Sequence, residues 1–158
     1  MSAPRGPSDL AAFVAERNIR AEIVPMALET PTVAAAAAAL GVESTQIIKT
    51  VLFLVKDEPV LVIASGEENV DRRPLADEFG VGKKQVKLAD RETVLAVTGY
   101  AAGGVPPFGH LALLPTLIDW RIEQMNVVYG GGGDDHTLLR VTPEELGRAT
   151  RGKWIALP

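Results

Sequence analysis

The sequence predicts one α/β domain whose sheet is mixed and mostly antiparallel, or partly closed into a barrel, with helices on its flanks. Two apolar segments of strand length, Ile47–Val55 and Val60–Ser65, are joined by only Lys56–Pro59, which indicates a hairpin. Neither segment alternates with polar residues, so we expect a sheet that is covered on both faces. Helix and strand signals are interleaved without strict alternation, which favours a mixed sheet over a doubly wound parallel one.

The expected helices are marked by capping residues and by glycines at their ends. The alanine-rich second helix should pack closely against a sheet, because its side chains are small. Together the helices are Asp9–Arg17 after an N-cap at Ser8, Val33–Leu40 opened by Thr30-Pro31-Thr32 and ended by Gly41, Asp71–Phe79 ended by Gly80, Arg91–Val97 capped by Asp90, and Glu144–Thr150 opened by Thr142-Pro-Glu-Glu145.

The remaining strands are shorter and are separated by turn residues. A strand over Leu111–Ile118 should be interrupted or end near Pro115, and Gly130–Gly133 with Asp134 and Asp135 should form a turn. The other expected strands are Ala21–Pro25, a short one flanked by Lys83, Lys84 and Lys87, and then Asn126–Tyr129, His136–Val141 and Trp154–Leu157.

Length and composition place limits on the class of protein. A chain of 158 residues with 47% hydrophobic and 23% charged residues fits one domain, which we expect over 8–158 after a flexible N-terminus over 1–7. The absence of cysteine excludes disulfides, a thiolate nucleophile and a Cys-ligated metal. No signal peptide or membrane span is evident, since the longest apolar run is only Val33–Leu40. We therefore expect a cytoplasmic protein with no membrane partner.

A formal net charge of -4 argues against a surface that grips a nucleic-acid backbone over a wide area, but it leaves room for a small basic site. Three lysines, Lys83, Lys84 and Lys87, could contact phosphates, or they could simply form a solvated basic face.

One stretch, Thr98–His110, combines four glycines with the adjacent prolines Pro106 and Pro107; we call it the glycine-proline loop. Glycine permits unusual backbone angles and close approach of a ligand, whereas proline fixes φ. This mixture favours a shaped loop over a flexible linker, although an ordinary surface loop has a similar composition.

Lys49 is the most unusual residue of the first half of the chain. In a strand it shares a face with Ile47 and Val51, so no polar face explains a lysine at this position. A lysine among apolar residues indicates a partner or a ligand. The alternative is a lysine at the edge of the strand whose ammonium reaches water.

Familiar catalytic patterns are absent from the sequence. His110 and His136 with scattered carboxylates do not form a metal-ligand pattern, and no serine stands in a nucleophile elbow. Gly130–Gly133 lacks the lysine and hydroxyl of a P-loop, which makes a phosphate-binding domain the least favoured reading. We expect no metal and no cofactor.

Three segments taken together resemble the YbaK/EbsC family, which includes the editing insertion domain of bacterial prolyl-tRNA synthetases. They are Ala36–Val42 running into Ile47–Phe53, the loop Thr98-Gly-Tyr100 leading to Gly103-Gly-Val-Pro-Pro-Phe-Gly-His110, and Tyr129–His136 followed by Thr142–Leu146. Their order and spacing cover roughly residues 20–157. The resemblance implies that family's fold, a compact editing domain.

The resemblance also implies hydrolysis of the ester in a mischarged aminoacyl-tRNA. The counterpart of Lys49 holds the terminal phosphate region of the tRNA, and the counterpart of Gly104 offers main-chain groups to substrate or water. A ribose hydroxyl of the substrate, and no protein base, assists the reaction. We expect Lys49 and Gly104 to be catalytic, and substrate to be bound by Thr50, Gly103, Val105, Pro106, Pro107, Gly109 and His136.

The amino acid that is removed from the tRNA is inferred from positions at which this chain differs from better-known members of the family. Cysteinyl-tRNA deacylases of the family tend to carry Gly-Gly-Cys-Ser-Pro where this chain has Gly103-Gly-Val-Pro-Pro107. His136 is similar to a late histidine that selects alanine in the synthetase domain; the alternatives are a structural turn histidine, or His110 in that place. The expected function is trans-editing of tRNA(Pro)-type substrates that carry a small amino acid. The expected partner is the acceptor end of aminoacyl-tRNA, a synthetase is a further candidate, and the alternative is a non-catalytic binding or regulatory module.

Overall fold

The two central apolar segments form neighbouring antiparallel strands inside a five-stranded sheet. The structure is a computed structural model that describes residues 3–30 and 32–157. In it, β2 (Ile48–Val55) pairs with β3 (Glu58–Ser65) along its whole length. The connecting residues Lys56 and Asp57 have φ values of 49° and 67°. Positive φ at both positions is the geometry of a two-residue hairpin turn whose twist matches that of the strands.

Three shorter strands complete this sheet in the order β4-β2-β3-β5-β8. On one side β4 (Val86–Leu88) is antiparallel to β2. On the other side β5 (Thr116–Asp119) runs parallel to β3, and β8 (Lys153–Ile155) runs parallel to β5. This sheet is mixed, as the sequence predicts, with two antiparallel and two parallel pairings among the described strands. Together with the second sheet, which is wholly antiparallel, most pairings are antiparallel, and the predicted fold class is confirmed.

A second sheet of three antiparallel strands lies against the first, in the order β1-β7-β6. Its strands are β1 (Ala21–Pro25), β7 (Thr137–Val141) and β6 (Val128–Gly131). A single parallel bridge between Ile47 and Tyr129 links the two sheets. Among the described strands neither sheet closes on itself, so the barrel alternative is not formed.

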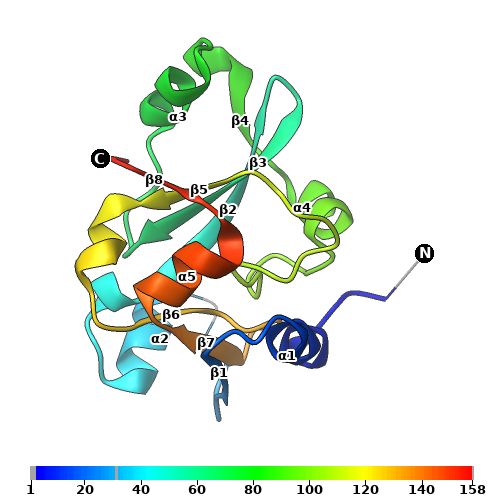
Figure 1. Cartoon of the computed structure of the whole chain (residues 1–158), viewed down its shortest axis with the longest axis vertical. Coiled ribbons are helices and arrows are strands. Elements are labelled where there is room, and N and C mark those ends of the chain that lie inside the picture. The colour runs from blue at the N-terminus through cyan, green and yellow to red at the C-terminus, as the bar shows by residue number, and fades with distance from the viewer. Residues whose placement is uncertain (1–2, 31, 158) are drawn as a thin grey trace.

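The described residues contain five α-helices. α3 stands at one end of the molecule, and α1 and α2 accompany the three-stranded sheet at the other (Figure 1). Side chains of the predicted caps Asp90 and Thr142 accept hydrogen bonds from their own helices. Asp71, which was expected as the first residue of its helix, is instead the cap of that helix and accepts from the Arg73 amide. The helices are α1 (Pro7–Glu16), α2 (Val33–Leu40), α3 (Arg72–Phe79), α4 (Arg91–Thr98) and α5 (Pro143–Thr150), with short 3-10 helices η1 (Ser44–Gln46), η2 (Lys83–Gln85) and η3 (Trp120–Gln124).

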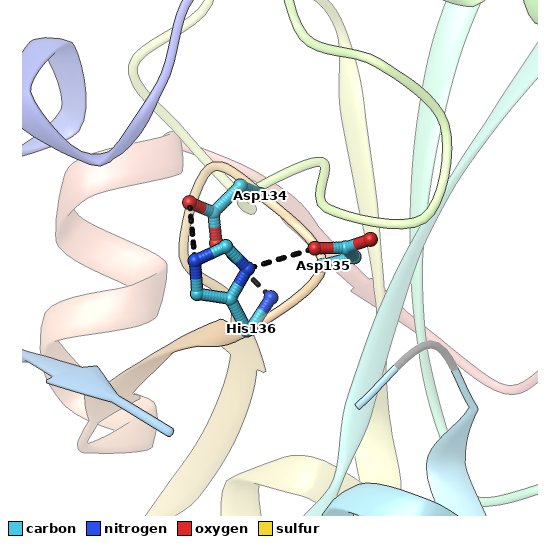
Figure 2. Close-up of side chains that lie close together, drawn as sticks. All are labelled: Asp134, Asp135 and His136. Carbon is cyan, nitrogen blue, oxygen red and sulfur yellow. Dashed lines mark hydrogen bonds and ion pairs between the residues drawn. The ribbon is translucent and has the colours of Figure 1, made fainter. Parts of the chain in front are cut away.

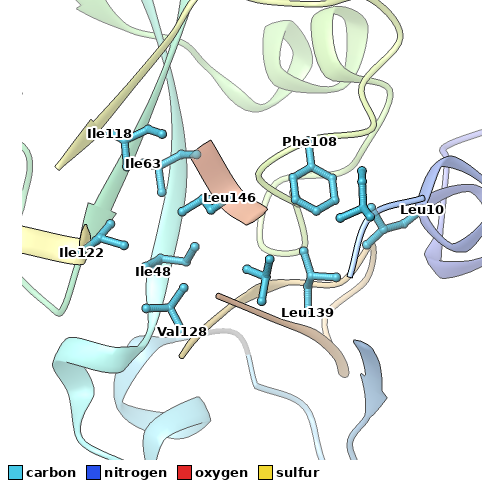
Figure 3. Packing of buried hydrophobic residues seen from close by; sticks show 11 residues of the cluster. Leu10, Ile48, Ile63, Phe108, Ile118, Ile122, Val128, Leu139 and Leu146 are labelled. Atoms are coloured by element: carbon cyan, nitrogen blue, oxygen red, sulfur yellow. The ribbon is translucent and has the colours of Figure 1, made fainter. Parts of the chain in front are cut away.

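The main apolar core fills the space between the two sheets (Figure 3). Ile48 and Ile63 from the large sheet meet Val128 and Leu139 from the small one, and Leu10 of α1 closes the far end. The opposite face of the large sheet packs against α3 through a separate cluster that includes Phe53, Val62 and Leu75. The large sheet is thus covered on both faces, as its continuous apolar strands predict.

The alanine-rich helix α2 contributes the close packing that its sequence predicts. Ala36 and Ala37 are buried against Ile47 and Leu138. The side chain of Thr32 accepts a hydrogen bond from the Ala35 amide at 3.1 Å and caps this helix. Pro31, which was expected to help open the helix, lies outside the described residues.

The predicted strand over Leu111–Ile118 is wrong in its first half. Residues 111–115 form a loop, in which Leu111 and Leu113 are exposed, and β5 begins only at Thr116. Pro115 has no N–H to donate to a ladder, although its carbonyl still accepts from the Leu61 amide of β3 at 2.9 Å. Of the leucines in this loop, only Leu114 is buried, where it packs with Leu52 and Leu61.

The four glycines Gly130–Gly133, the glycine run, are divided between a strand and a loop. The predicted strand Asn126–Tyr129 is displaced: β6 covers Val128–Gly131 and takes in the first two glycines that were expected in a turn. A Cβ on Gly130 would stand 3.1 Å from Ile48 Cγ1, and one on Gly131 would collide with the Val105 carbonyl. A side chain on Gly131 would therefore clash with the backbone of the glycine-proline loop, whereas one on Gly130 would require the Ile48 side chain to move.

At the two termini, element boundaries differ by a few residues. The first helix begins at Pro7, before the predicted Asp9. The last strand, β8, covers Lys153–Ile155, whereas Trp154–Leu157 was predicted. The Arg5 amide donates to the Gly99 carbonyl at 2.7 Å. The predicted flexibility of 1–7 stays a prediction, and residues 1, 2 and 158 lie outside the described part. No helix within that part is long and apolar enough to span a bilayer.

Candidate active site

Within the described residues, one edge of the inner strand β2 has no partner strand over Lys49–Val51. β4 pairs only with Phe53–Val55, and the bridge to β6 is made by Ile47. The Leu52 carbonyl still accepts a hydrogen bond from the loop after β4 on this edge. Because alternate residues of a strand direct their peptide groups to the same edge, the N–H and C=O of Thr50 face the gap.

A cavity of about 280 Å³, the central pocket, opens at this gap. It is enclosed by α2, β2, the start of α4, the glycine-proline loop and the glycine run that ends in Asp134. Most of the side chains in the wall are small and apolar; they include Val33, Ala36, Ala89, Val94, Ala102, Val105 and Leu138. A pocket of this size and lining suits a small ligand with few polar groups.

Thr50 is the polar residue that most needs an explanation in this wall. Its side-chain oxygen Oγ1 is buried and has no hydrogen-bond partner among the described residues. Buried hydroxyls are almost always paired, because leaving one unpaired costs about 1–3 kcal/mol. By strand alternation Thr50 shares its face with Ile48 and Leu52, the face turned towards the small sheet and the pocket. A ligand in the pocket would give this hydroxyl its missing partner.

Lys49 lies at the rim of the same pocket and is half-buried. Its ammonium donates to the carbonyls of Glu67, at 3.4 Å, and Glu68, in the loop after β3. Burial lowers the pKa of the Lys49 ammonium, and the nearby Glu68 carboxylate partly opposes that shift. β2 is an inner strand of the sheet, but its edge is unpaired at Lys49, and both hydrogen bonds of the ammonium lie at the surface. These contacts agree with the alternative of a lysine whose ammonium reaches water.

The glycine-proline loop supplies another wall, but its residues divide into two roles. Gly103, with φ of 99°, and Val105 line the pocket. Gly104 is buried between them: a Cβ there would stand 2.7 Å from the backbone of Asp134. Its carbonyl accepts from the Gly133 amide at 2.9 Å, and its own N–H donates to a carbonyl within the loop at 3.3 Å. In this structure the main-chain groups of Gly104 therefore shape the wall from behind.

Pro106, Pro107 and Gly109 are buried on the other side of this loop and do not line the central pocket. The Pro106 carbonyl lies 2.7 Å from Nε2 of His110, and the Gly109 carbonyl accepts from the Tyr100 hydroxyl at 3.2 Å. Burial lowers the pKa of the His110 imidazole. These contacts fix the course of the loop, and His110 faces a separate cavity of about 210 Å³.

His136 forms a small charged cluster with Asp134 and Asp135 (Figure 2). Its Nδ1 lies 2.8 Å from Asp135 Oδ1, and its Nε2 lies 3.6 Å from Asp134 Oδ2. The hydrogen bond to Asp135 and the charge of Asp134 raise the pKa of the imidazole. Asp134 lines the pocket, whereas the exposed His136 ring lies outside its wall. The three groups offer ligand atoms within 4.8 Å of one another, but their mutual contacts are those of a histidine ion-paired with two carboxylates.

The structure thus brings together four of the nine residues selected from the sequence, namely Lys49, Thr50, Gly103 and Val105. Sequence reasoning did not select Asp134, Val94 or the α2 residues Val33 and Ala36, which also line the pocket. A sequence feature could have pointed to Asp134: it directly follows four glycines, whose backbone can pack closely against other segments. The apolar wall residues resemble ordinary core positions and carry no such signal.

Comparison with known proteins places this geometry in a family. Residues 28–149 match the aminoacyl-tRNA editing domain. EbsC of Enterococcus faecalis, described as a proposed Cys-tRNA(Pro)/Cys-tRNA(Cys) deacylase, is 27% identical over 122 residues, which are 77% of this chain and 73% of that protein. A proline–tRNA ligase of Geobacter sp. (strain M21) is 31% identical over 106 residues, 66% of this chain but only 18% of the ligase.

A solved structure agrees over nearly the whole chain. The crystal structure of a proposed trans-editing enzyme for prolyl tRNA synthetase superposes with a TM-score of 0.89 at 30% identity, and the match covers 96% of this chain and 95% of that one. These findings confirm the resemblance to the YbaK/EbsC proteins and to the synthetase insertion domain that the loop and glycine motifs indicate. The chain belongs to the aminoacyl-tRNA editing domain family.

Proposed function

We propose that this protein is a free-standing deacylase that hydrolyses the ester of a mischarged aminoacyl-tRNA carrying a small amino acid. The observation that carries the proposal is the buried, unpartnered hydroxyl of Thr50 in a small apolar pocket beside the Lys49 ammonium. A hydroxyl, a free strand edge and a cation at one opening match an aminoacyl ester, which has a polar amino group, a carbonyl and a nearby phosphate.

The pocket is suited to positioning more than to acid–base chemistry. Of the residues in its wall, only Lys49 and Asp134 carry charge, and the Asp134 carboxylate already contacts His136. In the proposed reaction a water oxygen bonds to the ester carbonyl carbon, and the bond from that carbon to the ribose oxygen breaks. The departing ribose oxygen takes the proton that the water loses. A neighbouring ribose hydroxyl would orient the water, and an activated ester needs little more than correct placement and polarisation.

Each wall then has a role in holding the substrate. The Thr50 hydroxyl and peptide group would bind the amino acid, Gly103 and Val105 would confine it, and Lys49 would neutralise the terminal phosphate or the developing oxyanion. Gly104 would act by fixing that wall against Asp134. The small apolar lining favours alanine-sized groups over large ones, although such pockets separate similar small groups weakly.

The choice of tRNA follows from the relatives. One relative is named for proline–tRNA ligation and another for deacylation of Cys-tRNA(Pro), so tRNA(Pro)-type substrates are proposed first. The proposed partner is the acceptor end of the aminoacyl-tRNA, with an aminoacyl-tRNA synthetase as a second candidate. The proposed place of action is the cytoplasm, where such substrates are made.

A deacylation screen with purified protein tests the proposal. The substrates are Ala-tRNA(Pro), Cys-tRNA(Pro) and Ser-tRNA, and the variants are Lys49→Ala and, as a matched control, Lys84→Ala on the exposed η2 turn. We expect wild type and Lys84→Ala to release one amino acid, and Lys49→Ala to be slower by about 100-fold, the typical effect of removing one electrostatic group. Full activity in a folded Lys49→Ala protein would remove the role given to this lysine. If nothing is released from any substrate, the non-catalytic binding module takes the place of the enzyme.

A further inference from the structure

A second cavity, the basic groove, continues from the central pocket along β2. It has a volume of about 530 Å³, and its wall includes Arg72 at the start of α3 and Lys83 in η2. Lys49, Val51 and Leu88 line both cavities, so the two are adjacent and share the lysine at their junction. A ligand that fills the central pocket can therefore extend past Lys49 into the groove.

The groove is positively charged although the chain as a whole has a formal net charge of -4. Within the part of the chain that the structure describes, neither Arg72 nor Lys83 has a carboxylate oxygen within 4.0 Å. Asp71 is the only acidic residue in the wall, and its Oδ1 accepts from the Arg73 amide at 3.0 Å as the cap of α3. The cations of the groove are thus available to an anionic ligand.

Two further features suit a nucleotide chain. Leu88 is 57% exposed at the junction of the two cavities, and it offers an apolar surface to a base or a ribose. Asn69 adds an amide with both donors and an acceptor to the wall. The carboxylate of Glu68, which lies close to Lys49, belongs to a neighbouring cavity with Asp119 and does not line the groove.

We propose that the basic groove binds the single-stranded 3′ end of the tRNA. The terminal adenosine would lie at Leu88 and Lys49, and the phosphates of the nucleotides before it would contact Arg72 and Lys83. This inference rests on the proposed function. For Lys83 the sequence alone leaves two readings, phosphate contact or a solvated basic face, and the position of Lys83 in the groove favours phosphate contact. Short stretches of basic residues that follow a nucleic-acid backbone are the usual way to bind single strands without reading their sequence.

Binding of uncharged RNA tests the groove independently of catalysis. The probes are a fluorescent RNA hairpin with a 3′ CCA overhang and the same hairpin without it. The test protein is the double variant Arg72→Gln/Lys83→Gln, and the matched control is Arg73→Gln/Lys84→Gln, which alters the adjacent residue in each element. We expect the test variant to lose about tenfold in affinity for the overhang RNA, with a salt slope reduced by about 0.7 for each lost phosphate contact. The control variant should match wild type on both RNAs.

Kinetics distinguish phosphate binding from an effect on the ester site. We expect the test variant to raise KM for an aminoacylated hairpin about tenfold with little change in kcat, since the contacts are remote from the reacting bond. Hydrolysis of the corresponding aminoacyl-adenosine, which has no phosphate, should be unchanged. Equal losses on both esters, or equal RNA binding by the test and control variants, would overturn the proposal. If wild type cleaves neither ester, the proposed function fails. Binding of the fluorescent RNA hairpins, followed by fluorescence anisotropy, still decides whether the groove binds the 3′ end.

Discussion

The Cα of Gly104 lies so close to the backbone of Asp134 that a Cβ on the glycine would stand 2.7 Å from the Asp134 Cα and carbonyl group. The Gly133 amide donates to the Gly104 carbonyl at 2.9 Å beside this contact. The glycine-proline loop and the glycine run are therefore locked together, although they are far apart in the sequence. Their junction sets the position of the wall that Gly103 and Val105 present to the central pocket.

Replacing Gly104 by alanine should destabilise the protein because the added methyl group meets backbone atoms that cannot rotate away. Overpacking of this kind costs about 1–3 kcal/mol. Gly82→Ala is a matched control, since Gly82 has φ of -77° and its nearest contact would be a side-chain oxygen at 3.9 Å. Urea unfolding of the two variants measures the difference. Equal stability would show that the loop can move away from Asp134 at little cost.

Replacing Thr50 by valine should leave stability nearly unchanged or slightly higher, because the hydroxyl has no partner to lose. The proposed deacylation should fall about tenfold or more in kcat/KM, the loss expected for one hydrogen bond to substrate. Thr98→Val is the control: its Oγ1 donates to the Val94 carbonyl at 2.7 Å and accepts from the Tyr100 amide at 3.1 Å. That variant should lose about 1–3 kcal/mol of stability. A Thr50→Val enzyme with unaltered kinetics would argue against Thr50 as a ligand of the substrate.

The Glu145 carboxylate should stabilise the protein at neutral pH and lose this contribution in acid. This buried carboxylate accepts from Arg148 Nε at 2.8 Å and from the Arg20 amide at 2.6 Å, and these bonds lower its pKa from 4.5 to about 2. A depressed folded pKa stabilises the fold above pH 4.5, and the contribution is lost as pH falls towards 2. Thermal unfolding at pH 7 and pH 3 should show a smaller pH effect in Glu145→Gln, whereas the exposed Glu144→Gln should behave as wild type. The same pH dependence in both variants would assign acid sensitivity to other carboxylates.

The two histidines should titrate on opposite sides of 6.5, the ordinary histidine pKa. The pKa of His136 is raised by its hydrogen bond to Asp135 and by the Asp134 charge, whereas burial lowers that of His110. The raised value means that the His136 ion pairs add stability below pH 6.5 and lose it as pH rises through the folded pKa. NMR titration resolves both, since the chain has only two histidines. Asp135→Asn should lower the His136 value and leave His110 unchanged; no response at His136 would mean that the cluster seen in Figure 2 is not populated in solution.

The sequence by itself determined features that depend on neighbouring residues. Asp90 caps α4 by accepting from the Thr93 amide at 2.8 Å, and Gly41 ends α2 with φ of 69°. The order of strands along the chain, the hairpin at Lys56 and the oddity of Lys49 in an apolar strand were also legible. In the caps and the hairpin the stabilising contact joins residues a few positions apart, so residue type and spacing contain the information. Lys49 was legible for another reason, since a charged residue stands out among apolar neighbours.

Only the tertiary structure decided which residues form the pocket. Gly103 and Gly104 are identical in sequence terms, yet one lines the pocket and the other packs against Asp134. His136 follows the glycine run as the family resemblance suggests, but its ring lies outside the pocket wall. These outcomes depend on contacts between distant segments, because the space left between β2, β6 and the loop is fixed by their packing. Local patterns therefore predicted the elements, and long-range packing chose the site.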